Sequence, residues 1–341
     1  MKVTKFILTL SLALSLCACG KKSTTKDGTK TKVTTKKTTW GKTTGLVTDY
    51  EKMTFGVYPQ TLEKDETKIS ELNNLAGSLP TVDDFKAWTG YGYTNEWLDE
   101  YMWYIDIDEN MDGTNDYRGI YFTKYIFHSP YDVYDSYGKQ TQYGYKNLVT
   151  YWFKYEPIEW LVLKEESGKK LLLSNLVLNA NVYNYETEFN KKFDHNGGYG
   201  YGNDYALSSI RLLLINDFYN LAFSNSDKSK ILETLVDNSA SHTATEDYES
   251  TNTNDKVFLL SYKEVKLLIK NESQRMADAS DFAKIHGLAE YENNIGSWWI
   301  RGAVNECETS GFVNCYGGIH TEPNLHSETR GIRPAIWINA N

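Results

Sequence analysis

The fold of this 341-residue chain is decided near its end by the stretch Gly296-Ser297-Trp298-Trp299-Ile300-Arg301-Gly302 and, after a polar segment, by Gly331-Ile332-Arg333-Pro334-Ala335-Ile336-Trp337-Ile338. Both runs are rich in β-branched and aromatic residues, which favour strands. Side chains alternate along a strand, so Trp298 and Ile300 share one face while Trp299 and Arg301 share the other. We therefore expect two strands, each with one apolar face, that frame a long polar loop.

The first nineteen residues have the layout of a bacterial export signal. Lysines lie near the start, an apolar run extends from Phe6 to Leu16, and small residues surround Cys17 and Cys19. The run is too short to span a bilayer as a helix. Leu-x-Ala-Cys resembles the lipobox of bacterial lipoproteins, whose cysteine receives a diacylglyceryl anchor. We predict lipidation at Cys19 and a location on the outer face of the cytoplasmic membrane; an ordinary secretory signal is the alternative.

The predicted export signal comprises residues 1–19, and a linker follows it. Residues 20–45 are mostly Lys, Thr and Gly, and such a composition buries too little apolar surface to offset its chain entropy. We expect a disordered tether there. Residues 46–341 lack a second segment of this kind, and we expect them to form a single domain.

The folded part is strongly acidic. The whole chain has a formal net charge of −9; residues 1–45 hold ten lysines and one aspartate, so residues 46–341 keep 26 basic and 44 acidic side chains, or −18. Such a surface repels nucleic-acid phosphates and anionic lipids. Nucleic acid is therefore excluded as a partner of this domain.

A hairpin with an acidic turn is predicted between residues 97 and 125, with strands at 100–105 and 117–122. The turn contains Asp-x-Asn-x-Asp-Gly-x-x-Asp, which places Asp108, Asn110, Asp112 and Asp116 at the spacing of oxygen ligands in a calcium loop. The usual bidentate glutamate at the twelfth position is replaced by glycine, and strands rather than helices flank the loop. Calcium is one interpretation, and a solvated Asp-Gly turn is the other.

The remaining pattern alternates strands with short helices. Strands are expected at 53–58, ending at Pro59, and at 255–260, and a hairpin at 157–164 and 169–174. Helices are expected at 79–88, 205–220, 226–236, 261–271 and 280–286.

A glycine- and tyrosine-rich loop, residues 190–204, is one candidate for ligand contact. Tyr199 and Tyr201 offer large contact areas at small entropic cost. The spacing of its glycines does not match a nucleotide-binding fingerprint. A flexible loop without function is an equally good interpretation.

The loop at 302–330 is the second candidate. It holds His320 and His326, whose six-residue spacing is a weak signal for metal binding. It also holds Cys307 and Cys315, which would form a disulfide in an oxidising exterior or stay as two buried thiols. We favour the disulfide.

Several motifs, taken in order, resemble the bacterial domain-of-unknown-function family numbered 6273. They are Phe55-Gly56-x-Tyr58-Pro59-Gln60, Pro157-Ile158-Glu159-Trp160-x-Val162-Leu163, Leu171-Leu172-Leu173-Ser174, Ser209-Ile210-Arg211, Phe218-Tyr219-x-x-Ala222-Phe223-Ser224, Asp255-Lys256-Val257-Phe258-Leu259-Leu260-Ser261, Trp298-Trp299-Ile300-Arg301 and Gly331-Ile332-Arg333-Pro334-Ala335. The resemblance spans nearly all of the exported domain. It implies no known activity.

The C-terminal part of this pattern is also similar to the C-type-lectin fold of formylglycine-generating-enzyme-like proteins. That similarity implies an α+β, C-type-lectin-like mixed fold with several short helices and long loops. In such a fold the first and last strands pair, which would set residues 55–58 beside residues 332–337.

Two functions follow from these patterns. The first is an extracellular binding protein for a glycan, a peptide or a surface protein, with Trp299 among the aromatic contacts. The alternative is a formylglycine-generating-enzyme-like oxidoreductase or another extracytoplasmic enzyme, but Cys307 and Cys315 do not match the cysteine motif of that family. No catalytic residues are assigned. Arg211, Arg301 and Arg333 are interpreted as structural, as guanidinium groups paired with Asp or Glu.

Overall fold

The protein is described by a computed structural model, which defines residues 50–91, 101–123, 140–184, 194–195, 198–199, 203–243, 250–288, 294–304, 306–322 and 329–340. The chain divides into two units, residues 1–42 and residues 43–341. The predictions for Cys19, for the linker, for Tyr201 and for His326 lie outside the described residues.

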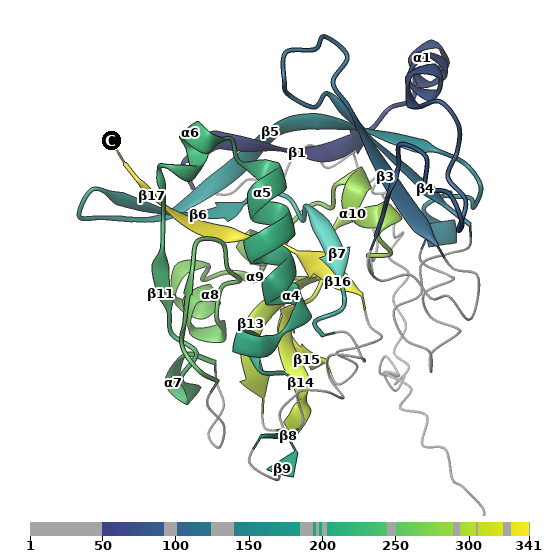
Figure 1. Cartoon of the computed structure of the whole chain (residues 1–341). Coiled ribbons are helices and arrows are strands. Elements are labelled where there is room, and N and C mark those ends of the chain that lie inside the picture. Colours follow the sequence, from purple (N-terminus) through teal and green to yellow (C-terminus); the bar gives the residue numbers. More distant parts are fainter. Residues whose placement is uncertain are drawn as a thin grey trace, which may run out of the picture. The chain divides into compact units, whose positions relative to one another are not determined.

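Two larger sheets, two small two-stranded sheets (β11 with β12, β8 with β9) and several short helices build the described part of the second unit (Figure 1). The strands are β1 (Lys52–Leu62), β2 (Thr89–Gly90), β3 (Met102–Ile107), β4 (Tyr117–Phe122), β5 (Tyr151–Glu166), β6 (Lys169–Ser174), β7 (Asn179–Asn181), β8 (Asp194–His195), β9 (Gly198–Tyr199), β10 (Ile231–Leu232), β11 (Thr234–Val236), β12 (Thr253–Asp255), β13 (Trp298–Val304), β14 (Glu306–Val313), β15 (Ile319–Glu322), β16 (Arg330–Ile332) and β17 (Ala335–Asn339). The helices are α1 (Glu66–Ala76), η2 (Tyr205–Leu207), α4 (Ser209–Leu212), η3 (Leu213–Phe218), α5 (Tyr219–Ala222), α6 (Asn225–Lys228), α7 (Ala240–Thr243), α8 (Tyr262–Leu268), α9 (Glu272–Arg275) and α10 (Asp281–Ile285).

The larger sheet is a curled antiparallel half-barrel organised around the long strand β5. One edge of β5 pairs with β1, and the other edge pairs first with β4 and then with β6. The described strands continue through β3 and β2 on one side and through β17 and β10 on the other. The protein is thus a mixed helix-and-sheet fold, as predicted.

The predicted pairing of the first and last strands is wrong. β1 pairs with β5, whereas β17 pairs with β6 and β10. Two strands therefore separate them, because the hairpin of β5 and β6, with its tight turn at Ser167 and Gly168, inserts between β1 and the C-terminus. The strand pairing that the resemblance to the C-type-lectin fold implies is therefore absent from the described strands.

The run Trp298-Trp299-Ile300-Arg301 lies in β13, part of the smaller sheet, whose described order is β15-β14-β13-β16-β7. β13 runs parallel to β16 and antiparallel to β14. The polar segment between residues 302 and 330 is thus largely two further strands rather than one long loop. Trp298, Trp299, Ile300 and Arg301 are all buried, so both faces of this first part of β13 are covered.

Gly56 lets strand β1 approach the helix behind it. Its φ is 70°, the strand register shifts between Thr54 and Val57, and a Cβ at this position would lie 2.6 Å from the carbonyl oxygen of Ala222. Only glycine accepts both this φ and this contact. The strand also runs on past Pro59 to Leu62, which an edge strand tolerates because no neighbour needs the missing N–H.

The helix predictions are partly confirmed. The segment predicted at 205–220 is helical from α4 to α5, and α8 and α10 begin at the predicted serine caps, Ser261 and Ser280. The helix predicted at 79–88 is wrong, because these residues form turns and bends, and the helix of this region is α1, which was not predicted and is capped by Asp65. Residues 226–236 begin in α6 and continue as β10 and β11 rather than as one helix.

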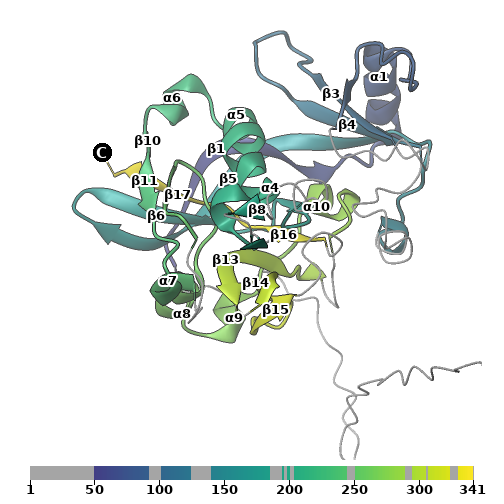
Figure 2. The ribbon, with the colours of Figure 1, turned by 60° about the horizontal axis from the view of Figure 1, so that its bottom comes forward.

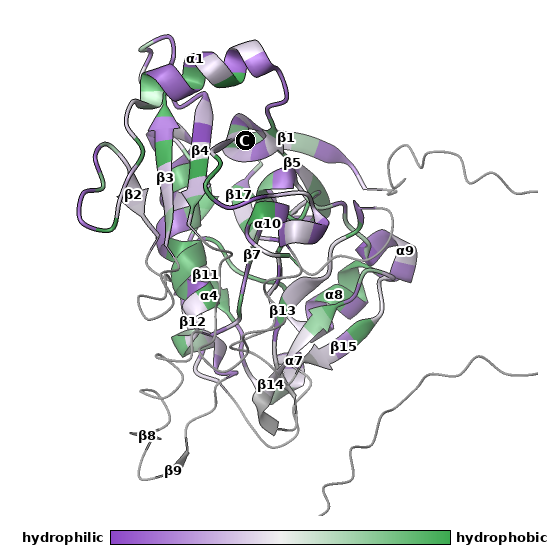
Figure 3. Ribbon diagram, turned by 90° about the vertical axis from the view of Figure 1, so that its right-hand side faces the viewer, coloured by the Kyte–Doolittle hydropathy of each residue, from purple (hydrophilic) through white to green (hydrophobic). Residues whose placement is uncertain are grey.

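One large core lies between the two sheets and the helices, and a smaller one lies between α1, β3 and β4. Figures 1 and 2 show α4 and α5 as one stretch of helix next to β1 and β5. Figure 3 shows hydrophobic and hydrophilic residues alternating along α1 and β3, as expected for elements with one buried face. In the described part of the chain we find no helix with the length and apolarity needed to cross a membrane.

Candidate functional site

A pocket of about 730 Å³ lies between the β3–β4 hairpin, strand β7 and the helical segment from α4 to α5. Its volume falls within the range of roughly 300–1,000 Å³ that is typical of small-molecule sites. Aromatic and polar side chains alternate around it. The lining residues are Tyr58, Gly90, Tyr91, Tyr104, Asp106, Arg118, Asn179, Ala180, Asn181, Ser209, Leu212, Leu213, Asn216, Asp217, Asn220, Leu221 and Phe282.

Arg118 is the central charged group of this pocket. Its Nε and Nη2 donate to the two carboxylate oxygens of Asp106 at 2.7 and 2.6 Å, and Tyr155 donates to Asp106 at 2.8 Å. The hairpin register of β3 and β4 places Asp106 directly opposite Arg118. Burial alone would lower the pKa of Arg118, but its interactions with Tyr91 and Asp106 raise it, so the guanidinium stays charged.

The ring of Tyr104, with Tyr91 tilted against it, holds Arg118 in place from the side. The Cζ of Arg118 lies 4.1 Å from the centre of the Tyr104 ring, and the Tyr91 ring lies 4.9 Å from that of Tyr104. A cation above an aromatic face is attracted by the ring quadrupole. With its side chain 8% exposed, Arg118 is thus fixed in orientation before any ligand arrives.

The opposite wall comes from β1 and β7. The Tyr58 hydroxyl accepts a 2.9 Å hydrogen bond from the amide of Asn179, and the Tyr58 ring packs edge-on against Phe282 at 5.5 Å. Burial raises the pKa of Tyr58, so its hydroxyl stays protonated and can donate. The bulge at Gly56 sets the direction of this tyrosine, two residues further along β1.

The rim of the pocket is a helix face with an irregular turn. Residues Leu213–Phe218 form a π-helical segment, a rare geometry that occurs often at functional sites. Asn216 and Asp217 lie on this segment and are exposed. Neither side chain has a hydrogen bond or ion pair with the described residues.

The pKa of Asp217 is raised by partial burial, an effect that the charge of Arg118 opposes. The oxygens of Asp106 are already occupied, because they accept three hydrogen bonds. The pocket therefore offers one available carboxylate, amide groups, hydroxyls and aromatic faces. Such a set can bind and orient a small polar molecule, but it lacks a second available carboxylate for acid–base work.

The acidic turn predicted to bind calcium is held by its own side chains. Asp108 accepts from the amides of Asp112 and Gly113 at 3.2 and 2.7 Å, and Asp116 accepts from the amide of Glu109 at 2.8 Å. Asn110 likewise accepts from the amide of Asp112. Within the described ranges no group of three or more His, Cys, Asp or Glu side chains is arranged to hold a metal ion. Calcium binding stays a prediction that requires the turn to rearrange.

The predicted aromatic ligand contacts lie apart from the pocket. Trp299 is fully buried, and its indole N–H donates to the carbonyl of Asn181 at 2.9 Å, so it belongs to the core. His320 is exposed on β15, beside the ring of Phe312, which in turn pairs with Trp299 across β13 and β14. Tyr199 lies in the short strand β9.

The predicted disulfide is not formed. Cys315 is a buried free thiol whose pKa is raised by burial. Cys307 lies near the start of strand β14, which ends at Val313, two residues before Cys315. At about 3.3 Å per residue the two Cα atoms are more than 10 Å apart, beyond the limit of about 7 Å for a disulfide.

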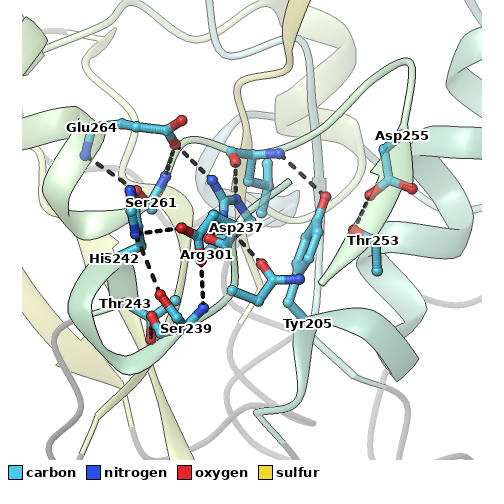
Figure 4. A network of polar contacts seen from close by, with 12 residues as sticks. Tyr205, Asp237, Ser239, His242, Thr243, Thr253, Asp255, Ser261, Glu264 and Arg301 are labelled. Atoms are coloured by element: carbon cyan, nitrogen blue, oxygen red, sulfur yellow. Dashed lines mark hydrogen bonds and ion pairs between the residues drawn. The ribbon is translucent and has the colours of Figure 1, made fainter. Parts of the chain in front are cut away.

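A second polar network surrounds Arg301 (Figure 4). Its guanidinium donates to the carbonyls of Leu259 and Asp237, to the amide oxygen of Asn238 and, at 2.7 Å, to Glu264. The guanidinium is 1% exposed, and every contact joins β13 to a loop or helix cap. This confirms the structural interpretation of Arg301.

The other two arginines are also structural. Arg211 forms an ion pair with the buried carboxylate of Asp255 at 2.6 Å, as predicted. Arg333 differs, because among the described residues it donates to the carbonyls of Ser174 and Arg275 and lies 5.1 Å from the Trp298 ring. Burial lowers the pKa of Arg333 to about 9.

Ser239, His242 and Asp237 lie close together in the Figure 4 network, but they do not form a catalytic triad. Both Ser239 and Asp237 approach the same ring atom, Nδ1 of His242, at 3.4 and 2.8 Å. A triad needs the nucleophile and the acid on opposite ring nitrogens. Asp237 also accepts from the amide of Ser239, just before α7, at 2.9 Å.

The pocket residues were missed by sequence reasoning. The sequence did contain a signal for Arg118 and Asp106. When residues of the predicted hairpin are paired across its two strands, starting from the turn, the arginine lies opposite the aspartate. Asn216 and Asp217 gave no such signal. A polar pair on a helix normally marks a solvated face, and only tertiary packing places it above a pocket.

Comparison with known proteins yields one match. The model of a family described as a domain of unknown function (DUF6273) matches residues 167–340, about half of the chain. No curated protein and no solved structure matches the chain. The matched region supplies β7 and the α4–α5 helix face of the pocket, whereas the Arg118 hairpin precedes it.

Proposed function

This chain belongs to the DUF6273 family of domains of unknown function, and we propose that it is an exported, membrane-tethered binding protein that holds a small polar ligand in the Arg118 pocket. The observation that carries the proposal is the convergence of Arg118, Tyr58, Tyr104, Asn216 and Asp217 on one cavity. Rigid aromatic walls with a few polar groups are the usual composition of a small-molecule site.

The lectin-like part of the proposal concerns the manner of recognition. Aromatic faces stack on a ligand, and amides and hydroxyls give directional hydrogen bonds. This manner of recognition does not depend on the pairing of the first and last strands. A glycan fragment or a peptide fragment satisfies these contacts. A surface protein would bind by inserting a protruding glycan or peptide segment into the pocket.

Attachment to the outer face of the cytoplasmic membrane through a diacylglyceryl group on Cys19 remains part of the proposal. It is supported by the lipobox-like Leu-x-Ala-Cys and the Lys/Thr-rich segment that follows. Membrane fractionation of a Cys19→Ser variant tests this part: retention of the variant in the membrane fraction would contradict it.

The oxidoreductase alternative is not favoured. Such chemistry needs a pair of reactive thiols, and thiolates form where positive charge lowers the pKa of a cysteine. Here burial raises the pKa of Cys315, and β14 holds Cys307 at a distance. Both observations weigh toward a binding protein.

The test is a thermal-shift screen of the full-length protein in detergent with sugars, peptidoglycan fragments and short peptides. For a ligand that raises the unfolding temperature, we expect an Asn216→Ala variant to bind about 2- to 10-fold more weakly, because one hydrogen bond is worth roughly 0.5–1.5 kcal/mol. Titration calorimetry measures the loss.

The matched control is Asn74→Ala, at an exposed position of α1 outside the pocket. It is expected to bind as the unchanged protein does. Equal affinities for the Asn216→Ala and Asn74→Ala variants would contradict the placement of the site.

A further inference from the structure

We propose that the ligand of the Arg118 pocket is a zwitterion of the amino-acid type, whose carboxylate binds Arg118 and whose ammonium group binds Asp217. The occupant would be a short peptide or an amino acid derivative. The inference rests on the proposed function and specifies the chemical class of its ligand.

The carboxylate half of the inference comes from the unused face of Arg118. A guanidinium has five N–H donors, and Asp106 takes those of Nε and one of Nη2. Nη1 has no acceptor among the described residues, although the side chain is only 8% exposed and lines the cavity. The Arg118 side chain is mostly buried, but Nη1 is not closed off from solvent. This nitrogen therefore favours a charged oxygen from a ligand, since such bonds are about twice as strong as neutral ones.

The ammonium half comes from the charge balance of the pocket. Arg118 and Asp106 cancel as an ion pair, so Asp217 leaves the lining with one net negative charge when it is ionised. Asp217 has no ion pair with the described residues, and its only charge interaction that lowers its pKa comes from Arg118. A ligand with a carboxylate alone would be repelled by Asp217, whereas one that also carries an ammonium group is attracted by both residues.

The remaining lining suits a peptide better than a single amino acid. The cavity of about 730 Å³ leaves room beyond the two charged groups, and Tyr91, Leu213 and Phe282 provide apolar wall for side chains. The amide of Asn216 has no partner among the described residues, and a primary amide complements the N–H and C=O of a peptide group. Neutral sugars would use the aromatic and amide groups but would leave Arg118 Nη1 and Asp217 without ionic partners.

The test compares four pooled libraries on the full-length protein at pH 7. They are zwitterionic dipeptides, the same dipeptides N-acetylated, the same dipeptides amidated at the C-terminus, and neutral oligosaccharides. At about 100 times the Kd the zwitterionic pool is expected to raise the unfolding temperature by about 4 °C. The acetylated and amidated pools each lose one charge and are expected to give less than a quarter of that shift.

Two variants separate recognition from folding. Asp217 is exposed, so Asp217→Asn is expected to leave the fold intact. It is expected to remove the difference in unfolding-temperature shift between the zwitterionic and acetylated pools. Asp83→Asn, also exposed but outside the pocket, is expected to preserve it. The same difference in the Asp217→Asn variant as in the unchanged protein would overturn the assignment of the ammonium site.

The outcomes distinguish this inference from the proposed function. Equal shifts of the unfolding temperature with the zwitterionic, acetylated and amidated pools would overturn the proposal of a zwitterionic ligand. A response to oligosaccharides alone would overturn it as well. In both cases the proposal that the pocket binds a ligand would stand. No response to any pool would contradict the proposed function as well. A response restricted to the zwitterionic pool supports both.

Discussion

At the scale of single residues, the same physical rule explains both the pocket and the polar contacts of Glu63 beside the smaller core. A buried charged group is stable only when hydrogen bonds replace the water that it has lost. Arg118 meets this condition only in part, through Asp106, and keeps Nη1 for a ligand. Glu63, beside α1, meets it fully: its oxygens accept from the amides of Lys64 and Asp65, from Tyr117 and from Lys154.

Glu63 therefore provides a prediction about acid stability. Burial alone would raise its pKa, but the four hydrogen bonds lower it to about 2. A carboxyl group with a lowered folded-state pKa stabilises the protein above its unfolded-state pKa, near 4.5, and this contribution is lost as the pH falls toward 2. We expect Glu63→Gln to lower the unfolding free energy at pH 7 by roughly 3 kcal/mol.

Urea unfolding at pH 7, 4 and 3 checks this prediction. The difference between the unchanged protein and the Glu63→Gln variant should shrink as the pH falls. Glu66→Gln, at an exposed position one turn away, is the control and should change little. A difference that stays constant from pH 7 to pH 3 would show that Glu63 does not act through its charge.

At the scale of elements, the strands and hairpins were largely predictable, and their neighbours were not. The two hairpins and the strand at 298–301 follow from local alternation and turn residues, which the sequence displays directly. The pairing of β17 with β6 instead of β1 depends on contacts between residues far apart in the chain. Local patterns carry no information on such contacts.

The helix errors have a similar cause. Residues 226–236 were predicted as one helix because apolar residues recur in them, yet Ile231 pairs with Ile338 of β17 and Val236 pairs with Thr253 of β12. A short apolar run fits a helix or a strand equally well until a partner strand is available. Tertiary pairing decided the outcome here.

The β-bulge at Gly56 is the element on which the pocket wall depends, and it can be tested. We expect Gly56→Ala to lower the unfolding free energy by about 1–3 kcal/mol, because the added Cβ meets the backbone oxygen of Ala222 and forces the strand away from the helix. Gly77→Ala is the matched control: its φ is also 70°, but no atom lies within 4 Å of the added Cβ.

The comparison separates crowding from backbone strain. Both variants acquire the strain of a positive φ, and only Gly56→Ala acquires the clash. Chemical denaturation of the two proteins gives the two free energies. A loss at Gly77 as large as that at Gly56 would mean that close packing of β1 on α5 contributes nothing.

At the scale of the whole molecule, the candidate site lies in a different place from the one predicted from the sequence. Sequence reasoning placed ligand contacts in the loops at 190–204 and 302–330, because conspicuous aromatic residues lie there. In the structure Trp299 is buried in the core, and much of the second loop forms the strands β14 and β15. The pocket instead joins Arg118 from the first half of the chain to Asp217 from the second, a juxtaposition that only the folded chain creates.

The most direct test of the central claim is hydrogen–deuterium exchange of the full-length protein with and without a ligand from the thermal-shift screen. We predict slower exchange in peptides that cover residues 102–122, 179–184 and 209–222, which surround Arg118 and Asp217. Protection confined to residues 306–322, with the three pocket segments unchanged, would contradict the account and return the binding site to the C-terminal strands.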